Sequence, residues 1–402
     1  MSLPLSGVRI LDFGHVVTGP FATSLLADLG ADVVKVESGM APDQARRLGP
    51  FRPGGPQDLE GSAIFASLNR NKRSVAINLK HPEGIEIALA LAERSDVLTE
   101  NFSVGVMERL GLGPDRVLER NRRLIYVSMS GLGAHGPHAD WVSFNIIIQA
   151  LSGLMLTTGS PGDPPVAVSN SWADFVAGLH GALVVAAALC RREVHGQGCW
   201  IDLSQYEANV LPLGHLVMAS QRAGRAVGRA GNRSMTRAPQ GCYRCDGEDA
   251  WCVLSVGDAA EWRSLVGLLG DDVLSDPRFD SLQARLAHAE EIDRSIEAWT
   301  RRRPARQAEE TLQRAGIPAT AVRTTGEVLD DLPRFSPGRR SVHHPVIGEM
   351  PVFPAPIRFD AAGARVDRAG PRLGEHTREV LHDLLGMSDA ELARLHDEGV
   401  LA

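Results

Sequence analysis

The first 130 residues alternate between short apolar runs and amphipathic segments, and this alternation constrains the fold more than any other feature. Buried strands are expected in the apolar runs at 8–14, 31–38, 72–80, 96–102 and 123–131. Helices are expected between them, at 20–30, 82–95 and 103–111. Strands joined by helical crossovers pair in parallel. The pattern therefore predicts an α/β fold with a Rossmann-like, doubly wound open sheet.

The chain changes character near residue 225. Residues 228–241, "GRAGNRSMTRAPQG", are rich in Gly and Arg and have no periodicity, as expected of a loop. A strand is predicted at 249–258, and three helical segments and a short strand at 317–322 follow it. This mixture predicts a smaller α+β unit, and the length of 402 residues agrees with more than one domain.

Composition and charge exclude several classes of protein. The net charge is −7 and the basic residues are scattered, which is not the pattern of a nucleic-acid-binding protein. Five cysteines in a chain of this length do not form a disulfide framework. The first residues, "MSLPLSGVRILDF", lack the basic head and long apolar run of a signal peptide. The chain is therefore expected to be cytoplasmic, with no membrane partner.

Two short motifs suggest cofactors but lack the required context. Gly131, Gly133 and Gly136 form G-x-G-x-x-G after a strand, but "PHADWVS" follows where a dinucleotide site needs a helix. Cys242 and Cys245 form a single C-x-x-C with no second pair, so they are expected to be strand residues and not zinc ligands. Neither a nicotinamide cofactor nor a metal is therefore predicted.

A single acid, Asp174, opens a long apolar helix in "SNSWADFVAGLHGALVVAAAL". The simplest interpretation is an N-cap, which is the commonest role of Asp at a helix start. However, Ser169, Asn170 and Ser171 offer caps one turn earlier, and small residues follow as in a helix packed closely against backbone or ligand. A poorly hydrated carboxylate is what nucleophilic catalysis on an acyl group requires. Asp174 is therefore the candidate nucleophile.

Several ordered motifs together resemble the family III CoA-transferases, whose relatives include α-methylacyl-CoA racemase. They are "LSGVRILDFGHVVTGPFATSLLADLGADVVKVE", "NRNKRSVAINLKHPEG", "DVLTENFSVGVMERLGL", "LIYVSMSGLG", "QALSGLM", "SWADFVAGLHGAL", "GQGCWIDLSQYEA" and "GPRLGEHTREVL". The resemblance implies a large CoA-binding domain from 1–200 and 335–402 and a small domain at 225–325. The linkers would be 201–224 and 326–334. It also implies an interlocked homodimer, with each active site between the large domain of one chain and the small domain of the other.

The resemblance also implies a mechanism. In the family, the carboxylate that matches Asp174 attacks an acyl-CoA thioester, and an aspartyl–acyl anhydride and an aspartyl-CoA thioester follow in turn. A carboxylic acid then takes over the CoA. The substrates are thus an acyl-CoA and a carboxylic acid, coenzyme A is carried as substrate, and no prosthetic group or metal is implied.

The CoA contacts of the family carry over to positions along the first 110 residues. The loop "HVVTGP" matches the pantetheine path at His15, Val16, Gly19 and Pro20. Positions further along match an apolar contact, a phosphate-binding lysine, two residues at the adenosine end and a phosphate-binding arginine: Ile77, Lys80, Asn101, Phe102 and Arg109.

Three departures from the family pattern bear on specificity. Ser38 stands where formyl-CoA transferase has a basic residue, and Arg46 or Arg47 could supply that charge. The Gly-rich lid of that enzyme is absent from 231–245, so a formyl-CoA and oxalate specificity is not expected.

The third departure concerns the racemase. Residues 143–145 read Ser-Phe-Asn where the racemase has Gly-His-Asp, and only a loop histidine, His138, could substitute. Two alternatives to the transferase stay open: an acyl-CoA racemase or epimerase, and a non-catalytic CoA-binding protein. The sequence identifies neither the acyl donor nor the acceptor acid.

Overall fold

The structure is a computed structural model that describes residues 2–55, 58–335, 340–359 and 363–401. The chain divides into two compact units, which are described separately. The first unit comprises Met1–Met155, Ala167–Arg225 and Gly338–Ala402, so both chain ends belong to it. The second unit comprises Leu156–Val166 and Ala226–Pro337.

A six-stranded parallel sheet forms the centre of the first unit, in the order β3-β2-β1-β4-β5-β6. Its strands are β1 (Arg9–Asp12), β2 (Asp32–Glu37), β3 (Arg73–Ala76), β4 (Val97–Glu100), β5 (Ile125–Ser128) and β6 (Cys199–Asp202). The five strands predicted from the apolar runs are confirmed. The sixth was missed, because β6 is a four-residue edge strand whose side chains are only half-buried or exposed.

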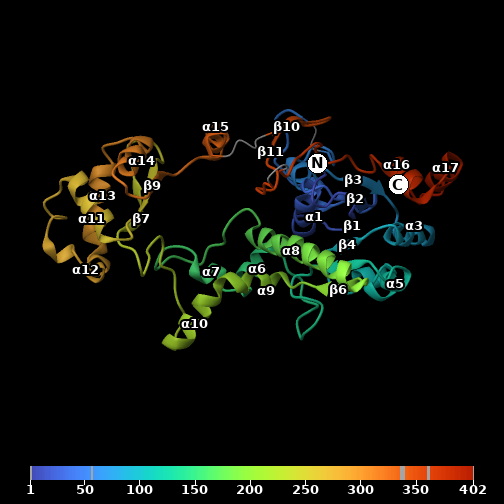
Figure 1. The fold of residues 1–402 in the computed structure, drawn as a ribbon, viewed down its shortest axis with the longest axis horizontal. Helices are drawn as coiled ribbons and strands as arrows, with labels where there is room; N and C mark the ends of the chain where they lie inside the picture. The colour runs from blue at the N-terminus through green and yellow to red at the C-terminus, as the bar shows by residue number, and fades with distance from the viewer. Residues whose placement is uncertain (1, 56–57, 336–339, 360–362, 402) are drawn as a thin grey trace. The chain divides into compact units, whose positions relative to one another are not determined.

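Helices cover both faces of this sheet (Figure 1). Neighbouring strand residues point to opposite faces, so Ile10 and Val97 join one core while Leu11 and Leu98 join the other. The first face carries α1 (Thr18–Asp28) and α8 (Trp172–His195). The second carries α3 (Pro82–Glu93), α5 (Pro114–Arg120), α16 (Thr377–Leu385) and α17 (Asp389–Asp397).

Shorter elements complete the first unit. They include the hairpin β10 (Arg340–His344) and β11 (Gly348–Val352), and the helices α2 (Ala63–Leu68), α4 (Val106–Arg109), α6 (Asn145–Leu151), α9 (Gln205–Val210) and α10 (Gly214–Ala223). The short helix α7 (Leu154–Thr157) spans the boundary between the two units in the sequence. Residues 201–224 also have the composition of one long helix, but the structure contradicts that interpretation, because β6 occupies the first of them and a 3₁₀ turn at Leu211–Leu213 interrupts the rest.

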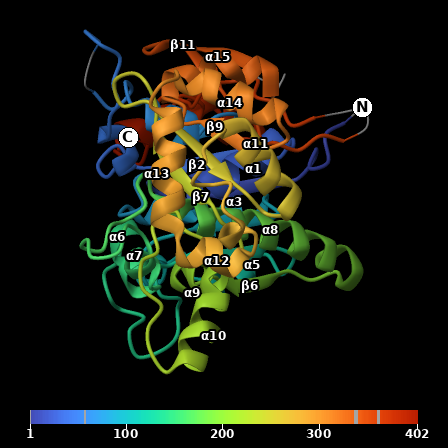
Figure 2. The same cartoon turned by 90° about the vertical axis from the view of Figure 1, so that its left-hand side faces the viewer.

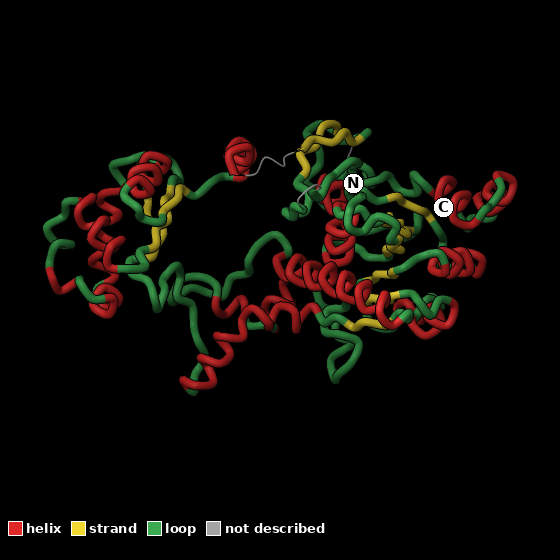
Figure 3. The backbone as a smooth tube through the Cα atoms, viewed as in Figure 1, coloured by secondary structure: helices red, strands yellow, loops and turns green. Residues whose placement is uncertain are grey.

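The second unit is an antiparallel sheet packed against helices (Figures 2 and 3). Its elements are β7 (Gln240–Arg244), β8 (Trp251–Ser255), β9 (Ala319–Ala321), α11 (Ala259–Leu269), α12 (Leu282–Ala287), α13 (Ala289–Thr300), α14 (Ala305–Arg314) and α15 (Thr325–Phe335). Cys242 lies within β7 and Cys245 directly after it, and Cys245 is buried in the core beside Cys252 of β8. In the described residues, no group of three or more His, Cys, Asp or Glu side chains is placed to hold a metal ion.

Helix α8 passes very close to α1 and to β5. A Cβ added to Gly178 would lie 2.9 Å from the carbonyl oxygen of Thr18, and one added to Gly181 would lie 2.6 Å from Sδ of Met129. By length and composition α8 is also one helix that could cross a membrane. Here its small residues are used for packing, and they fix the start of α8 beside the start of α1.

Candidate active site

The loops after β1 and β4 meet at the carboxyl edge of the sheet. The strand order reverses between these two strands, which is where open α/β sheets bind ligands. The amide of His15 donates to Oδ1 of Asn101 (2.7 Å), and the Asn101 amide group donates back to the carbonyl oxygen of His15 (3.0 Å). The rings of His15 and Phe102 meet edge to face, with centroids 5.0 Å apart. The structure thus brings together three of the predicted CoA-binding residues.

Val16 holds a left-handed backbone conformation in the first of these loops, with φ of 63°. This conformation is a strained one for a β-branched residue. The carboxylate of Asp43 stabilises it, because Oδ1 accepts hydrogen bonds from the amides of Val16 (2.8 Å) and Ala45 (2.9 Å). The shape of the loop after β1 therefore depends on Asp43, a residue that follows β2 in the chain.

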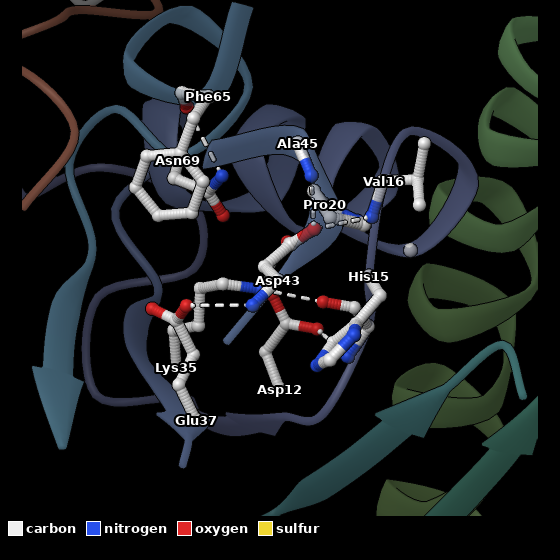
Figure 4. A network of polar contacts seen from close by, with 12 residues as sticks. Asp12, His15, Val16, Pro20, Lys35, Glu37, Asp43, Ala45, Phe65 and Asn69 are labelled. Carbon is white, nitrogen blue, oxygen red and sulfur yellow. Dashed lines mark hydrogen bonds and ion pairs between the residues drawn. The ribbon is translucent and has the colours of Figure 1, made fainter. Parts of the chain in front are cut away.

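Asp43 belongs to a cluster of six buried charges, of which Figure 4 labels Asp12, Lys35, Glu37 and Asp43. Three ion pairs of 2.8–2.9 Å link side chains that are fully inaccessible to solvent: Asp12–Lys72, Lys35–Asp43 and Glu37–Arg46. Three cations thus balance three anions, as burial of charge requires. Burial alone would raise the pKa of Asp43, but the Lys35 ammonium and the backbone donors lower it to about 2.

Arg46 and Arg47 were the two candidates to supply the positive charge that is absent at Ser38, and they differ in solvent exposure. Arg46 is fully buried and donates to Glu37, to Glu60 and to two backbone carbonyls. Its charge serves the buried cluster, so the suggestion that it compensates for Ser38 is wrong. Arg47 is exposed and stays a prediction.

The other predicted CoA contacts differ in exposure. Lys80 and Arg109 are exposed, and neither has an ion-pair partner within the described part of the chain. The guanidinium of Arg109 lies over Gly105. Both cations are therefore available to an anionic ligand. Ile77 is fully buried in the core cluster against which Phe102 packs, so its side chain supports the loop from below. Their roles as ligand contacts stay predictions.

Asp174 is the third residue of α8 and is partly buried. The hydroxyl of Thr18, the first residue of α1, donates to Oδ1 of Asp174 (3.1 Å). Asp174 has no ion pair with any residue that the structure describes. Burial raises its pKa to about 6, while the Thr18 hydrogen bond and the backbone amide of Asp174 oppose that rise. At neutral pH the site thus holds an ionised, poorly hydrated carboxylate, which is a competent nucleophile.

The start of α8 is capped from elsewhere in the fold. Ser171 occupies the N-cap position with φ of 55° and makes no side-chain cap, so the expectation that it would cap the helix is wrong. Instead, Oδ1 of Asn145 accepts from the amide of Ala173 (3.0 Å), and the amide group of Asn209 donates to its carbonyl oxygen (3.0 Å). The sequence analysis missed Thr18 and both asparagines as parts of the site. Of these three residues, only Asn145 had been noted in the sequence, because it differs from the racemase pattern at that position.

The loop after β5 has no dinucleotide-binding geometry. Between Gly136 and the start of α6 at Asn145 the structure describes no helix. Both carboxylate oxygens of Asp202 instead accept from the amide of Ala134 (2.9 Å), which holds the loop against β6. His138 is exposed and lies against Trp141, with centroids 4.0 Å apart. No contact links His138 to Asp174 among the described interactions.

Gly178→Ala is expected to separate α8 from α1. The new methyl group would meet the backbone of Thr18 at 2.9 Å, so the helices must move apart and weaken the Thr18–Asp174 hydrogen bond. We expect a loss of about 1–3 kcal/mol in the free energy of unfolding. Urea denaturation measures this loss. Gly267→Ala, where a methyl group meets nothing within 4 Å, is the control. Equal stability of the two variants would contradict the tight helix contact.

Asp174→Asn is expected to stabilise the protein at neutral pH. The pKa of Asp174 is raised from 3.8 to about 6 in the folded chain, so ionisation above pH 6 favours the unfolded state. Removing the charge should then raise the unfolding free energy by about 1–3 kcal/mol at pH 7.5. The gain should largely vanish as pH falls from 6 to 4. Urea denaturation of both proteins at pH 7.5 and pH 4 tests this expectation, and a gain that is absent at pH 7.5 would contradict it.

Comparison with known sequences agrees with this geometry. Residues 5–377 match the sequence model of CoA-transferase family III. A succinyl-CoA–D-citramalate CoA-transferase of Chloroflexus aurantiacus is 35% identical, and the match covers 99% of this chain and 98% of that protein. A formyl-CoA:oxalate CoA-transferase of Rhodopseudomonas palustris is 34% identical over 100% of this chain and 98% of its own length.

Comparison with solved structures gives the same result for the fold. A CAIB/BAIF family protein from Brucella suis superimposes with a TM-score of 0.86 and is 29% identical. The superposition covers 96% of this chain and 100% of that chain.

Proposed function

The chain belongs to CoA-transferase family III and is an acyl-CoA:carboxylate CoA-transferase, and on this premise we propose that Asp174 carries the transfer covalently. The observation that carries the proposal is the state of this carboxylate. It is partly buried, has no ion-pair partner among the described residues, and has a pKa raised to about 6. A structural acid in such a place would normally be paired.

The proposed reaction begins with attack by a carboxylate oxygen of Asp174 on the acyl carbon of the donor thioester. The carbon–sulfur bond breaks, CoA leaves as a thiolate, and an aspartyl–acyl anhydride forms. The thiolate then attacks Cγ of Asp174 and releases the donor acid, which leaves an aspartyl-CoA thioester. The acceptor carboxylate attacks the same Cγ and expels the thiolate. The thiolate finally attacks the acceptor carbonyl, which frees Asp174 and yields the new acyl-CoA.

The first unit offers features suited to binding CoA. The loop with His15 would line the pantetheine path at the sheet edge, and Asn101, which is hydrogen-bonded to that loop, would lie at the adenosine end. Lys80 and Arg109 are exposed cations and would bind the phosphate groups. The strained loop is already fixed by Asp43, so little ordering is needed when the thioester binds. Both covalent intermediates hydrolyse, so water must be kept from Asp174 during the reaction.

The substrates are best identified by a panel of carboxylic acids with succinyl-, acetyl-, formyl- and longer acyl-CoA donors. The proposal predicts that CoA moves from at least one donor to one acid, which mass spectrometry of the thioesters would detect. With Ser38 in place of a basic residue and no Gly-rich lid at 231–245, formyl-CoA with oxalate is not expected to be the preferred pair. Exchange of the α-proton in deuterated water without any acceptor would instead indicate a racemase.

The proposal includes an interlocked homodimer in the cytoplasm. Helices α6 and α8 contact each other and α9, and the segment 211–218 follows α9 directly. Large apolar side chains are exposed on α6, on α8 and within 211–218: Ile146, Ile147, Leu151, Trp172, Leu179, Leu183, Leu211, Val217 and Met218. Two of them, Trp172 and Leu211, line a cavity of about 390 Å³ together with Leu154, Val176 and His180 among others. Exposed apolar surface of this kind is typical of an interface. The five cysteines are free, as in a reducing compartment.

Analytical ultracentrifugation tests the assembly. The proposal predicts a species of twice the 43.2 kDa chain mass at assay concentrations. A fully active monomer would contradict it.

A further inference from the structure

Thr18 holds one oxygen of the nucleophile. It is the first residue of α1 and is fully buried, and in the described structure its hydroxyl makes one hydrogen bond, to Oδ1 of Asp174 at 3.1 Å. The backbone of Thr18 is held in place because Gly178 of α8 packs directly against it. The donor and the acceptor are therefore fixed by one helix contact.

The two carboxylate oxygens of Asp174 are thereby made unequal. Oδ1 accepts the Thr18 hydroxyl, whereas Oδ2 receives no hydrogen bond from any other residue that the structure describes. An oxygen whose lone pairs are not engaged by a protein donor is the better nucleophile. The geometry thus favours Oδ2 as the oxygen that attacks the donor and leaves Oδ1 as the carbonyl oxygen of each aspartyl intermediate.

We propose that Thr18 is a catalytic residue, whose hydroxyl stabilises the negative charge that develops on Oδ1 when Cγ of Asp174 is attacked. This inference rests on the proposed covalent route. When the thiolate attacks the anhydride at Cγ, the C=O electron pair moves onto Oδ1, and it returns as the donor carboxylate leaves. When the acceptor carboxylate attacks the thioester, the pair moves onto Oδ1 again and returns as the thiolate leaves. No proton is transferred in either step.

A single preorganised donor of this kind carries a substantial share of the rate. Removal of one oxyanion donor typically lowers kcat by about 10²–10³-fold. Thr18 also offsets part of the burial effect on the ionisation of Asp174. Loss of the hydroxyl should therefore slow the steps at Cγ and also move the acidic limb of the kcat/KM profile to higher pH.

The test compares Thr18→Val, which keeps the shape of the side chain, with Thr18→Ser, which keeps the hydroxyl. Ser24→Ala is the matched control, because Ser24 is buried on the same helix and its hydroxyl bonds only its own helix, at the carbonyl oxygen of Phe21. The homodimer is mixed with acyl-CoA alone and quenched over time, and the aspartyl-CoA adduct is quantified by mass spectrometry. Discharge of the adduct by the acceptor acid and the pH profile are measured next.

Thr18→Val is expected to slow both formation and discharge of aspartyl-CoA by about 10²-fold, with the acidic limb shifted upward. Thr18→Ser should stay within about threefold of the wild type, and Ser24→Ala should match it. Discharge at the wild-type rate in a folded Thr18→Val enzyme would overturn the role of Thr18 and leave the covalent route standing. Equal losses in the Val and Ser variants would overturn it as well. If the wild type itself forms no adduct, the proposed function fails first.

Discussion

Asp174→Ala is expected to lower kcat by about 10⁴-fold or more, while the enzyme still binds acyl-CoA. The variant removes Cγ and both carboxylate oxygens, the atoms that form the covalent bonds, and the described residues place no second carboxylate in hydrogen-bond contact with Thr18. Asp174→Asn should fail equally, since an amide keeps the shape but is not nucleophilic. Steady-state assays with the acid pair found in the panel would measure both losses.

The control for this experiment is Asp383→Asn, which removes an exposed carboxylate on α16. It should retain wild-type kcat. Binding of a non-hydrolysable CoA analogue should be unchanged in the Asp174 variants, which separates loss of chemistry from loss of the fold. An Asp174→Ala enzyme with more than about a tenth of wild-type kcat would contradict the assignment of the nucleophile.

Lys35→Met is expected to cost about 3–5 kcal/mol of unfolding free energy, the typical loss when one partner of a buried ion pair is removed. Lys35 pairs with Asp43 and lies near Asp12 and Glu37, all fully or almost fully buried. Without the ammonium, three buried carboxylates would face two cations. The loop around Val16 should loosen too, because Asp43 fixes it. Urea denaturation and CoA titration measure these effects.

Lys80→Met is the stability control, because Lys80 is exposed and has no ion pair among the described residues. A second variant tests charge balance directly. Adding Asp43→Asn to Lys35→Met restores neutrality, so the double variant should be less destabilised than the sum of the two single losses. Additive losses, or a Lys35→Met protein as stable as the Lys80→Met protein, would contradict a coupled and balanced cluster.

The sheet could be predicted because its strands are buried on both faces and therefore read as continuous apolar runs. Edge strand β6 could not be predicted in this way, because Trp200 and Asp202 are exposed and interrupt the apolar run. The start of α8 was expected near Asp174 and lies at Trp172, but its capping was not predicted. The first-turn amide of Ala173 is capped by Asn145, and Asn209 donates to the carbonyl oxygen of the same residue; contacts between distant segments leave no local pattern.

The site was predictable to a similar degree. Asp174 stood out because a single charge at the start of an apolar helix is unusual. The loop residues His15, Asn101 and Phe102 were named from the resemblance to the family, and the structure brings them together. The role of Arg46 was misjudged, because sequence alone does not show that an arginine is fully buried against Glu37. Thr18 was missed because only the approach of two helices brings its hydroxyl to the nucleophile.

Mass spectrometry of the enzyme quenched during turnover tests the central claim most directly. The wild type, digested after brief mixing with acyl-CoA and no acceptor, should yield a peptide that carries CoA on Asp174. Addition of the acceptor acid should remove this adduct as quickly as product appears. Turnover at the normal rate with Asp174 unmodified at every time point would show that CoA passes directly between the substrates, and the covalent account would be wrong.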